Sequence, residues 1–434
     1  MKDFNKIILF LLSILYLFLT SNNCYALPSF ARQTGMSCND CHTVFPALTP
    51  AGRDFKLGGY TQSKSNTLYE TLPPIAAGVA LGYTVSKGLT NGIAPYNAAN
   101  RGTDALDLPS GVALYYAGRV YGPVGAWIEV DYDGIGNAFS LGMLDIRFAE
   151  TTKISDKPFT YGITINNMPT MEDPWNSSAM WGFPYLTSPV ASASTISSMI
   201  DGGFMGQLGG FGAYGYWNDT IYLALSVYRT TLNGITEPFG AGMTTTTVVS
   251  GAVPYWRLAI NQKFDKDQTF MIGTYGTVAS IYPLGASSGA TDMYTDIAVD
   301  TQYQYISDPH IITLMATWIH ETQSLDATFR AGGASNNSDN LNTFKVNLGY
   351  YNRSKIGTIG GTVGYFSTTG TADSLMYGNG VGMAGMKMQG SSPNNNGFIS
   401  EIDYLPLKNI KIAVQYVAYN QSNNYLYFYG RIMF

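Results

Sequence analysis

The last ten residues of the chain, 425–434, read YLYFYGRIMF. Apolar or small residues occupy every second position from Leu426 to Phe434, while three tyrosines and Arg431 lie at positions between them. Because neighbouring side chains of a β-strand point to opposite faces, this pattern predicts a strand with one broad apolar face. Soluble sheets seldom expose such a face to water, so the pattern favours a strand that faces lipid.

The same alternation of apolar and polar residues recurs from Pro74 to the end of the chain, in segments of about ten residues. Short groups of turn-forming residues separate these segments at 122–123, 155–156, 218–219, 265–267, 308–309, 353–355 and 407–409. Longer stretches rich in Gly, Ser, Asn and Thr lie between the turns at 86–110, 168–202, 233–253, 284–291, 326–340 and 369–397, with two short ones at 133–137 and 421–424.

This alternation of short turns and long loops is typical of outer-membrane barrels, in which the short turns are periplasmic. Seven turns and eight loops join sixteen strands, and an even number returns the chain to the side where it began. The sequence therefore predicts an all-β fold, a transmembrane antiparallel β-barrel of about 16 strands over residues 74–434, with both ends periplasmic. The alternative is a soluble propeller or sandwich.

The composition excludes several other classes of protein. Only 12% of the 434 residues are charged, 14% are aromatic, and the chain contains 48 glycines and 32 tyrosines. Because the hydrophobic residues are dispersed, the chain is neither a helical membrane protein nor a disordered one. The low charge also makes a typical cytosolic enzyme improbable.

Residues 1–26 have the features of a secretory signal peptide. An apolar stretch, 7–19, follows Lys2 and Lys6, and small residues precede a cleavage point after Ala26. Its removal takes the formal net charge from −5 to −6, which argues against nucleic acid as a partner. A lipid-anchored Cys24 is the alternative, but polar residues stand before it.

The two remaining cysteines lie in Cys38-Asn39-Asp40-Cys41-His42, the C-x-x-C-H pattern of c-type haem attachment. Two thioether bonds at Cys38 and Cys41 would fasten one covalent haem c and deliver the His42 imidazole to its iron as the proximal ligand. A zinc site would need four ligands, and the other histidines are distant in sequence. A redox dithiol would not require a histidine directly after the second cysteine.

The other groups around the haem are less determined by the sequence. Met36 is so close to Cys38 that its sulfur is expected near the porphyrin rim, and the distal ligand stays open. Arg32, Arg53 and Lys56 flank the motif and are candidate partners for the haem propionates, although solvation at the surface explains each of them equally well.

The haem segment with its linker, 27–73, is small for an independent domain. Its core, 27–60, is shorter than the roughly 40 residues below which chains seldom fold alone. We therefore expect the segment to lodge in the lumen of the barrel, whose inward side chains would cover the porphyrin.

Residues 28–60 resemble the amino-terminal segment of a known family, the outer-membrane fusions of a monohaem cytochrome to a porin-like barrel, which include iron oxidases of iron-oxidising bacteria. The likeness covers Pro28 to Cys38, Cys41-His42, Phe45-Pro46, Leu48-Thr49 and Gly52 to Lys56. Over the barrel it extends only to strand pattern and length. The terminal Phe434 also resembles the signal by which such barrels are recognised for assembly.

The resemblance implies an outer-membrane electron conduit that oxidises extracellular Fe(II) and passes electrons to a periplasmic carrier. Two alternatives remain: outward electron transfer to an external acceptor, and a solute porin with a haem plug or sensor. The direction of electron flow, the potential and the oligomeric state are not encoded in any pattern we recognise.

Iron favours hard oxygen ligands, and carboxylates occur in or beside the expected loops. The candidates are Glu172, Asp173, Asp201, Asp292 and Asp296. Solvation as a loop residue is the simpler explanation for each of them. A methionine group could attract copper(I), although a loop or strand edge explains it more simply; its members are Met383, Met386 and Met388. His310 and His320 fit strand positions and are not assigned to iron.

Overall fold

The structure is a computed structural model that describes residues 28–43, 46–63, 73–86, 104–133, 138–178, 182–191, 196–230, 247–377, 392–419 and 424–434. Residues 1–26, predicted to be a signal peptide, most of the linker and the methionines at 383, 386 and 388 lie outside these ranges. Among the described residues, no helix is both long and apolar enough to cross a bilayer.

Among the described residues, three short helices precede the sheet, and three more short helical turns lie in its connections or beside them. The helices and turns are α2 (Pro28–Thr34), α3 (Cys38–Cys41), α4 (Pro50–Leu57), η3 (Met199–Asp201), η4 (Pro283–Gly285) and α5 (Asp326–Arg330). The strands are β1 (Ile75–Ser86), β2 (Asp104–Tyr121), β3 (Val124–Asp133), β4 (Ala138–Ile154), β5 (Lys157–Asn166), β6 (Leu208–Trp217), β7 (Ile221–Thr230), β8 (Val248–Val249), β9 (Val253–Lys263), β10 (Gln268–Tyr282), β11 (Asp292–Ser307), β12 (His310–Ser324), β13 (Ser338–Ser354), β14 (Gly357–Gly370), β15 (Asn395–Leu407), β16 (Ile410–Tyr419) and β17 (Tyr425–Met433).

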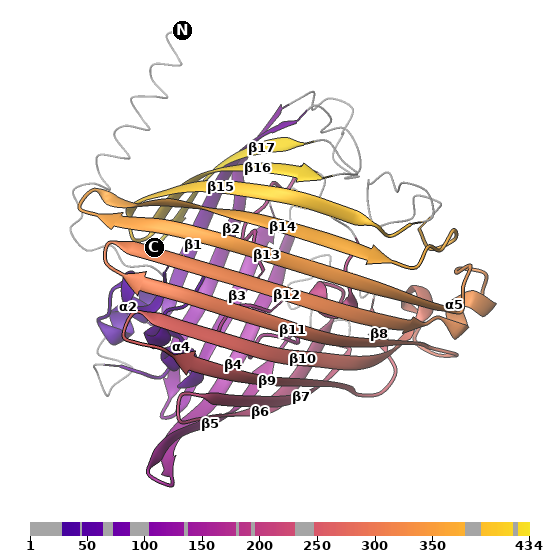
Figure 1. Cartoon of the computed structure of the whole chain (residues 1–434), viewed down its shortest axis with the longest axis horizontal. Helices are drawn as coiled ribbons and strands as arrows, with labels where there is room; N and C mark the ends of the chain where they lie inside the picture. The colour runs from indigo at the N-terminus through magenta and orange to yellow at the C-terminus, as the bar shows by residue number, and fades with distance from the viewer. Residues whose placement is uncertain are drawn as a thin grey trace.

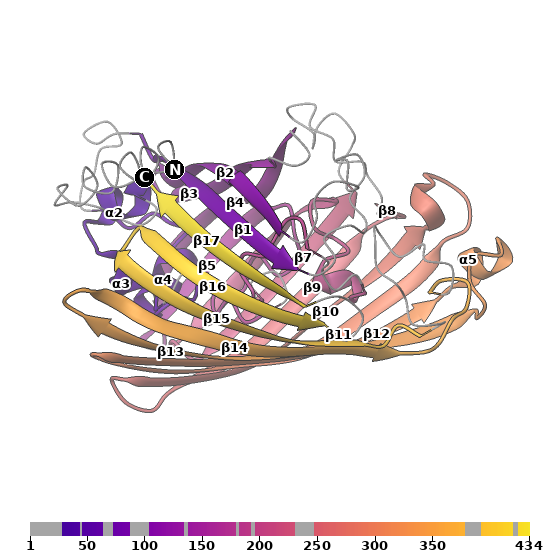
Figure 2. The ribbon, with the colours of Figure 1, turned by 90° about the horizontal axis from the view of Figure 1, so that it is seen from above.

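The strands form a closed antiparallel barrel (Figures 1 and 2). Each long strand pairs with the next along the chain, and β17 pairs with β1 from Gly78↔Met433 to Ser86↔Tyr425. β8 has only two residues, and it pairs with β10, as β9 does directly after it. β8 therefore adds no strand of its own to the ring, which contains sixteen long strands. The predicted fold class and strand number are therefore confirmed. The main-chain bonds between Phe434 and Ala77 complete the closure.

The connections also alternate as the sequence predicts. All seven predicted short turns lie at or directly beside a junction between consecutive strands at one end of the barrel, beginning with the turn between β2 and β3. The left-handed backbone at Ser155 and Asp156 and at Asn218 and Asp219 is typical of two-residue hairpin turns. Each predicted longer loop overlaps a connection at the other end.

Strand β7 illustrates how the two faces of the barrel differ. Its outward side chains Ile221, Leu223, Leu225 and Val227 are exposed, whereas Tyr222, Ala224, Ser226 and Tyr228 point inward and are buried. This arrangement is the reverse of that in a soluble barrel, whose exposed face is polar. Strand β17 has the same arrangement, with Leu426 and Phe428 facing outward. An apolar exterior over many strands matches the hydrocarbon of a bilayer.

The connection between β5 and β6 differs from the prediction. We expected residues 168–202 to form an external loop, but the described part of this connection folds into the lumen. Ser188 bonds to Thr84 of β1, Leu186 accepts a bond from Gln415 of β16, and Asp201 pairs with Lys345 of β13. We call residues 167–207 the plug loop. A sequence rich in Gly, Ser and Asn is solvated equally well by water or by the polar lining of a barrel, so its composition did not distinguish the two locations.

The amino-terminal segment, 28–63, lies inside the end of the barrel that carries the short turns (Figure 2). The Tyr60 hydroxyl donates to Asp145 of β4 at 2.6 Å, and the Tyr214 hydroxyl of β6 donates to the Leu57 carbonyl at 2.6 Å. Arg53 donates to Gln304 of β11 at 2.7 Å. The segment is thus held from several sides of the barrel wall.

Candidate functional site

Helix α3 brings both cysteines to one side of a single helical turn. Its start is fixed by Ser37, whose main-chain N–H donates to Asp40 Oδ2 at 2.6 Å, and its end by the His42 N–H, which donates to the Cys38 carbonyl at 2.8 Å. Residues three apart on a helix are neighbours, so the thiols of Cys38 and Cys41 lie next to each other with the His42 ring directly after them. Cys38 and Cys41 are not joined by a disulfide.

The chain then turns back over α3. Thr49 Oγ1 donates to the Asp40 carbonyl and accepts from the Gly52 N–H, so this one side chain caps α4 and ties it to α3. The two helices approach so closely that a Cβ atom at Gly52 would lie 2.1 Å from the Cys41 carbonyl oxygen. Any larger residue at Gly52 would separate the helices.

Cys38, Cys41 and His42 all line one pocket, whose empty space of about 710 Å³ includes its opening to solvent. Its walls are mainly apolar and include Phe30, Leu48, Phe55 and Tyr60 of the segment. The barrel supplies Trp127 of β3, and the plug loop supplies Asn176. A flat, largely apolar cofactor could therefore be enclosed jointly by the segment, the barrel wall and the plug loop.

The state of the three donor groups fits haem attachment. Burial lowers the pKa of His42 to about 4, so the imidazole is neutral and can serve as a metal ligand. Burial, with the nearby Asp40 charge, raises the pKa of the Cys41 thiol to about 11, opposite to the lowered pKa of a reactive dithiol. The donor set and the pocket thus fit haem c better than a redox dithiol.

The three basic residues that flank the C-x-x-C-H motif have different surroundings. Arg53 is 4% exposed and Lys56 is 3% exposed, so neither is a solvated surface residue. Arg53 donates to Gln302 and Gln304 of β11, whereas Lys56 lines the pocket. Arg32 donates to the Ile75 carbonyl at 2.6 Å and therefore ties α2 to the start of β1. Met36 also lines the pocket, beside Ser37.

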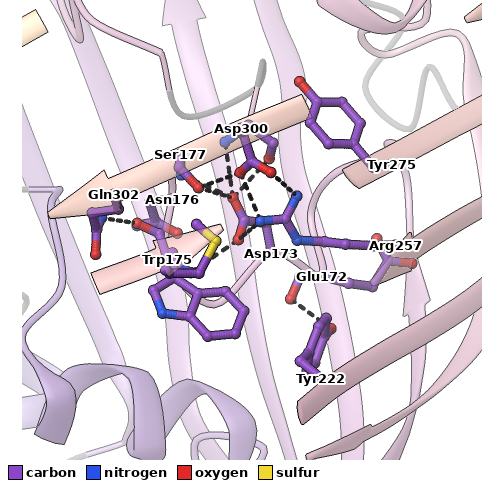
Figure 3. A network of polar contacts seen from close by, with 12 residues as sticks. Glu172, Asp173, Trp175, Asn176, Ser177, Tyr222, Arg257, Tyr275, Asp300 and Gln302 are labelled. Atoms are coloured by element: carbon purple, nitrogen blue, oxygen red, sulfur yellow. Dashed lines mark hydrogen bonds and ion pairs between the residues drawn. The ribbon is translucent and has the colours of Figure 1, made fainter. Parts of the chain in front are cut away.

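A buried polar network joins the plug loop to the barrel wall above the segment (Figure 3). Arg257 of β9 forms ion pairs with Asp173 at 3.1 Å and with Asp300 of β11 at 2.7 Å. Asp173 also accepts from three main-chain N–H groups of its own loop, and Ser177 Oγ donates to Asp300 Oδ2. All three charged side chains are fully buried, so the network fixes the loop tightly within the lumen.

The inward side chains of β11 bind, in order along the strand, the amino-terminal segment, the plug loop and the start of α5. Gln304 and Gln302 bind the segment, Asp300 binds the plug loop, and Asp296 accepts from the Ile200 N–H at 2.9 Å. Asp292 accepts from the Ala327 N–H at the start of α5. Because alternate side chains of a strand point to the same face, the single strand β11 contacts the segment, the plug loop and α5.

The five carboxylates suggested as external iron ligands are instead buried in the lumen. Glu172 bonds to Ser226 and Tyr228, Asp173 pairs with Arg257, and Asp201 pairs with Lys345. Asp292 and Asp296 bind backbone amides as described above. Among the described residues, no three His, Cys, Asp or Glu side chains are grouped so as to hold a metal ion. The expectation of solvated loop positions was therefore wrong, because the loop that carries three of these residues turns inward.

The other two histidines lie in the barrel wall, beside polar groups of the neighbouring strand. His310 Nδ1 lies 2.9 Å from the Tyr350 hydroxyl, and His320 Nδ1 lies 2.9 Å from Asn342 Oδ1. Both side chains belong to β12, as the strand prediction requires.

Four residues that complete the site were not identified from sequence: Trp127, Asn176, Arg257 and Asp300. Arg257 carried a signal, since a lone arginine at an inward position of an otherwise apolar strand needs a buried carboxylate partner. No local pattern indicated Asn176, because its partners are far away in the chain.

No protein-family model matches the chain, and no curated protein matches it. Among solved structures, it is similar to OmpT of Vibrio cholerae folded in vitro, with 7% identity, a TM-score of 0.45, and coverage of 83% of this chain and 96% of that one. The outer-membrane channel DcaP of Acinetobacter baumannii has 13% identity, a TM-score of 0.44 and coverage of 83% and 96%. Salmonella typhi OmpF, in complex with daunomycin, has 10% identity, a TM-score of 0.42 and coverage of 83% and 97%. These likenesses are distant, so the fold assignment rests on the closed ring of strand pairs in this chain.

Proposed function

We propose that this protein is an outer-membrane electron conduit, which takes electrons from extracellular Fe(II) and delivers them to a periplasmic carrier. The observation that carries the proposal is the common pocket of Cys38, Cys41 and His42, which is walled by barrel and plug-loop residues. A haem attached there supplies one-electron redox chemistry. Each Fe(II) ion releases one electron and becomes Fe(III), and the carrier gains that electron.

Each residue of the site has a part in this function. Cys38 and Cys41 provide the two sulfur atoms for covalent attachment. His42 provides a neutral imidazole nitrogen, because burial lowers its pKa to about 4. Phe30, Phe55 and Trp127 exclude water from the pocket, which raises the energetic effect of every nearby charge.

The apolar exterior supports a membrane location. Outward side chains on opposite parts of the ring, such as Leu225 of β7 and Phe428 of β17, are apolar and exposed. A soluble protein would be destabilised and prone to association with such a surface. The short turns lie at the end that holds the segment, which supports a periplasmic position for that end and for the amino terminus.

The filled lumen supports a conduit for electrons over an open pore for solutes. Inward side chains that would line a water-filled channel, Arg257, Tyr222 and Tyr275, have 0% exposure. Electrons can cross a packed interior to a bound redox centre, whereas sugars and hydrated ions cannot. The apolar wall meanwhile keeps ferric product outside.

Stopped-flow spectroscopy of the purified protein in detergent tests the proposal. Fe(II) should reduce the haem in a single exponential phase whose rate rises with Fe(II) concentration. In His42→Ala the low-spin spectrum should be lost while heat-modifiable migration of the barrel is retained, with His310→Ala as the matched control. Failure of Fe(II) to reduce the wild-type haem at the growth pH would exclude Fe(II) oxidation.

Outward electron transfer and solute transport are the two alternatives, and separate measurements distinguish them. A strongly negative midpoint potential in a redox titration would favour outward reduction of an external acceptor. Rapid sugar or ion flux into liposomes that persists after loss of haem would favour the solute porin.

A further inference from the structure

Two carboxyl groups of the barrel wall bind the helical turn η3 of the plug loop. The main-chain N–H of Met199 donates to Glu321 Oε2 of β12. The N–H of the next residue, Ile200, donates to Asp296 Oδ2 of β11 at 2.9 Å. Both acidic side chains are 1% exposed. Because the two N–H groups belong to consecutive residues, the two carboxyl groups lie beside each other on the wall.

The pairing of β11 with β12 brings the same two side chains together (Figure 1). Asp296 and Glu321 are directly opposite each other in the register, and the Cβ atoms of such pairs are about 4.5–5.5 Å apart. Glu321 Oε1 accepts a bond from Gln323 Nε2 at 2.6 Å. Asp296 Oδ1 is buried, and no described residue donates a hydrogen bond to it. The pair therefore has room for one proton on a buried oxygen atom.

The charged groups nearby do not neutralise the pair. Among the described residues, neither acid forms an ion pair, and the ammonium of Lys345 on β13 is paired with Asp201 of η3 itself. Two neighbouring carboxylates without a counter-ion are strongly disfavoured where water is excluded, whereas one proton on the pair removes the repulsion. The other titratable side chains around the pair are phenols, which are uncharged near neutral pH, or groups with other partners; they are Tyr275, Tyr294, Tyr377, Asp292, Asp339 and His320.

Release of η3 from the wall changes the number of bound protons. Once water reaches both carboxyl groups, each ionises above the ordinary carboxyl range of about pH 4. The docked state then binds one more proton than the released state, so the released population rises with pH, by up to about tenfold per pH unit. Ile200 and Phe204 pack in an apolar cluster with Tyr275, which favours the docked state. The released state is therefore a minor one, and its population depends on pH.

We propose that Asp296 and Glu321 share one proton and thereby form a pH-sensitive latch, which holds η3 on the barrel wall at acidic pH and releases it as the pH rises. The latch fastens one part of the plug loop that fills the lumen. It involves no residue of the haem pocket, so it is independent of the proposed function.

Amide hydrogen exchange in the full-length protein in detergent micelles tests the latch, because minor open states determine the exchange of buried amides. After correction for the intrinsic exchange rate at each pH, the protection of the Met199 and Ile200 amides should fall by up to about tenfold per pH unit. The Ser178 amide is an internal control, since it also donates to a buried plug-loop carboxylate, that of Asp173. Asp173 has Arg257 as its counter-ion, so the protection of Ser178 should not change over the same pH range.

Variants of the acids identify the groups that bind the proton. Glu321→Gln keeps the shape of the side chain and an oxygen that can accept from the Met199 N–H, but it removes one of the two charges. The protection of both η3 amides should then be independent of pH. Glu129→Gln is the matched control, because Glu129 is also a buried glutamate of the lumen, 8% exposed, and accepts from the Tyr115 hydroxyl. It should keep the pH dependence of the wild type. Asp296→Asn serves as a second test variant if Glu321→Gln does not fold.

Three results would overturn the latch. One is equal protection of the η3 amides at every pH in the wild type. Another is an unchanged pH dependence in Glu321→Gln or, if that variant does not fold, in Asp296→Asn. The third is a parallel loss of protection at Ser178, which would mean that the plug loop opens as a whole and not at η3.

Discussion

Lys56 is a buried lysine whose charge should influence the proposed haem site. Its Nζ donates to the Asp173 carbonyl at 2.6 Å and to Asn176 Oδ1 at 3.1 Å. Burial, with the nearby Arg147 charge, lowers the pKa of Lys56 to about 7. The ammonium is therefore charged below this pH and neutral above it.

We predict that the midpoint potential falls as the pH rises through about 7. A positive charge in a poorly solvated pocket favours the reduced iron, and this charge is lost when Lys56 releases its proton. Redox titrations on either side of this pH measure the effect. Lys56→Met should show a weaker pH dependence, whereas Lys355→Met, at an exposed turn, should behave as the wild type does.

The same pKa shift affects stability, with a sign that follows from proton binding. From about 7 up to the ordinary lysine pKa, the unfolded chain binds a proton at Lys56 that the folded chain does not. The free energy of unfolding should therefore rise with pH in this window. Lys56→Met should lack this rise in chemical unfolding followed by tryptophan fluorescence.

Arg257 is the cation that neutralises the plug-loop network. It pairs with both Asp173 and Asp300, and its side chain is 0% exposed. Replacing it with methionine would leave two buried carboxylates without their shared partner.

We predict that Arg257→Met lowers the free energy of unfolding by about 3–5 kcal/mol, as for other broken buried ion pairs. Guanidinium titration in detergent micelles measures the change. Arg229→Met removes an exposed arginine at the end of β7 and should alter stability by less than about 0.5 kcal/mol. Equal stability of Arg257→Met and the wild type would mean that the network does not hold the loop.

At the scale of elements, the plug loop fills part of the lumen. It contacts β1, β13 and β16 as well as β11, and it therefore extends across the lumen. A β-barrel of this size would otherwise enclose a channel wide enough for solutes.

We predict that replacing residues 182–198 with a short Gly-Ser linker opens a conducting pore. Conductance in planar bilayers and sugar uptake by liposomes should both increase strongly over the wild type. Shortening the connection 286–290 between β10 and β11 is the control and should leave both low. If the loop replacement conducts no better than the control, another part of the chain closes the lumen.

At the scale of the whole molecule, the barrel and the amino-terminal segment depend on each other unequally. The strand ring is closed by main-chain pairing between β1 and β17, which involves no residue of the segment. The segment, by contrast, takes part of its pocket from Trp127 and Asn176. Arg147 and Asp145 on the barrel wall pair with each other at 2.8 Å.

We predict that deletion of residues 28–63 yields an assembled barrel with a lower unfolding temperature. The lost contacts include the bonds of Tyr60 to Asp145 and of Arg53 to Gln304, which leave polar groups of the wall without these partners. Heat-modifiable electrophoresis over a temperature series measures this. His42→Ala, which keeps the segment, should unfold near the wild-type temperature in the absence of haem. Complete loss of the folded barrel would show that the segment is needed for assembly.

The sequence by itself determined the sixteen strands, the end of the barrel at which each connection lies and the motif of Cys38, Cys41 and His42. These features depend on local rules: a period of two in strands, turn-forming residues at hairpins, and fixed spacing in the haem motif. Only the tertiary structure decided that the connection after β5 turns inward, that Arg257 joins Asp173 to Asp300, and that Asn176 reaches Pro46. Those contacts join residues far apart in the chain, and the polar composition that suits a loop in water also suits the lining of a closed barrel.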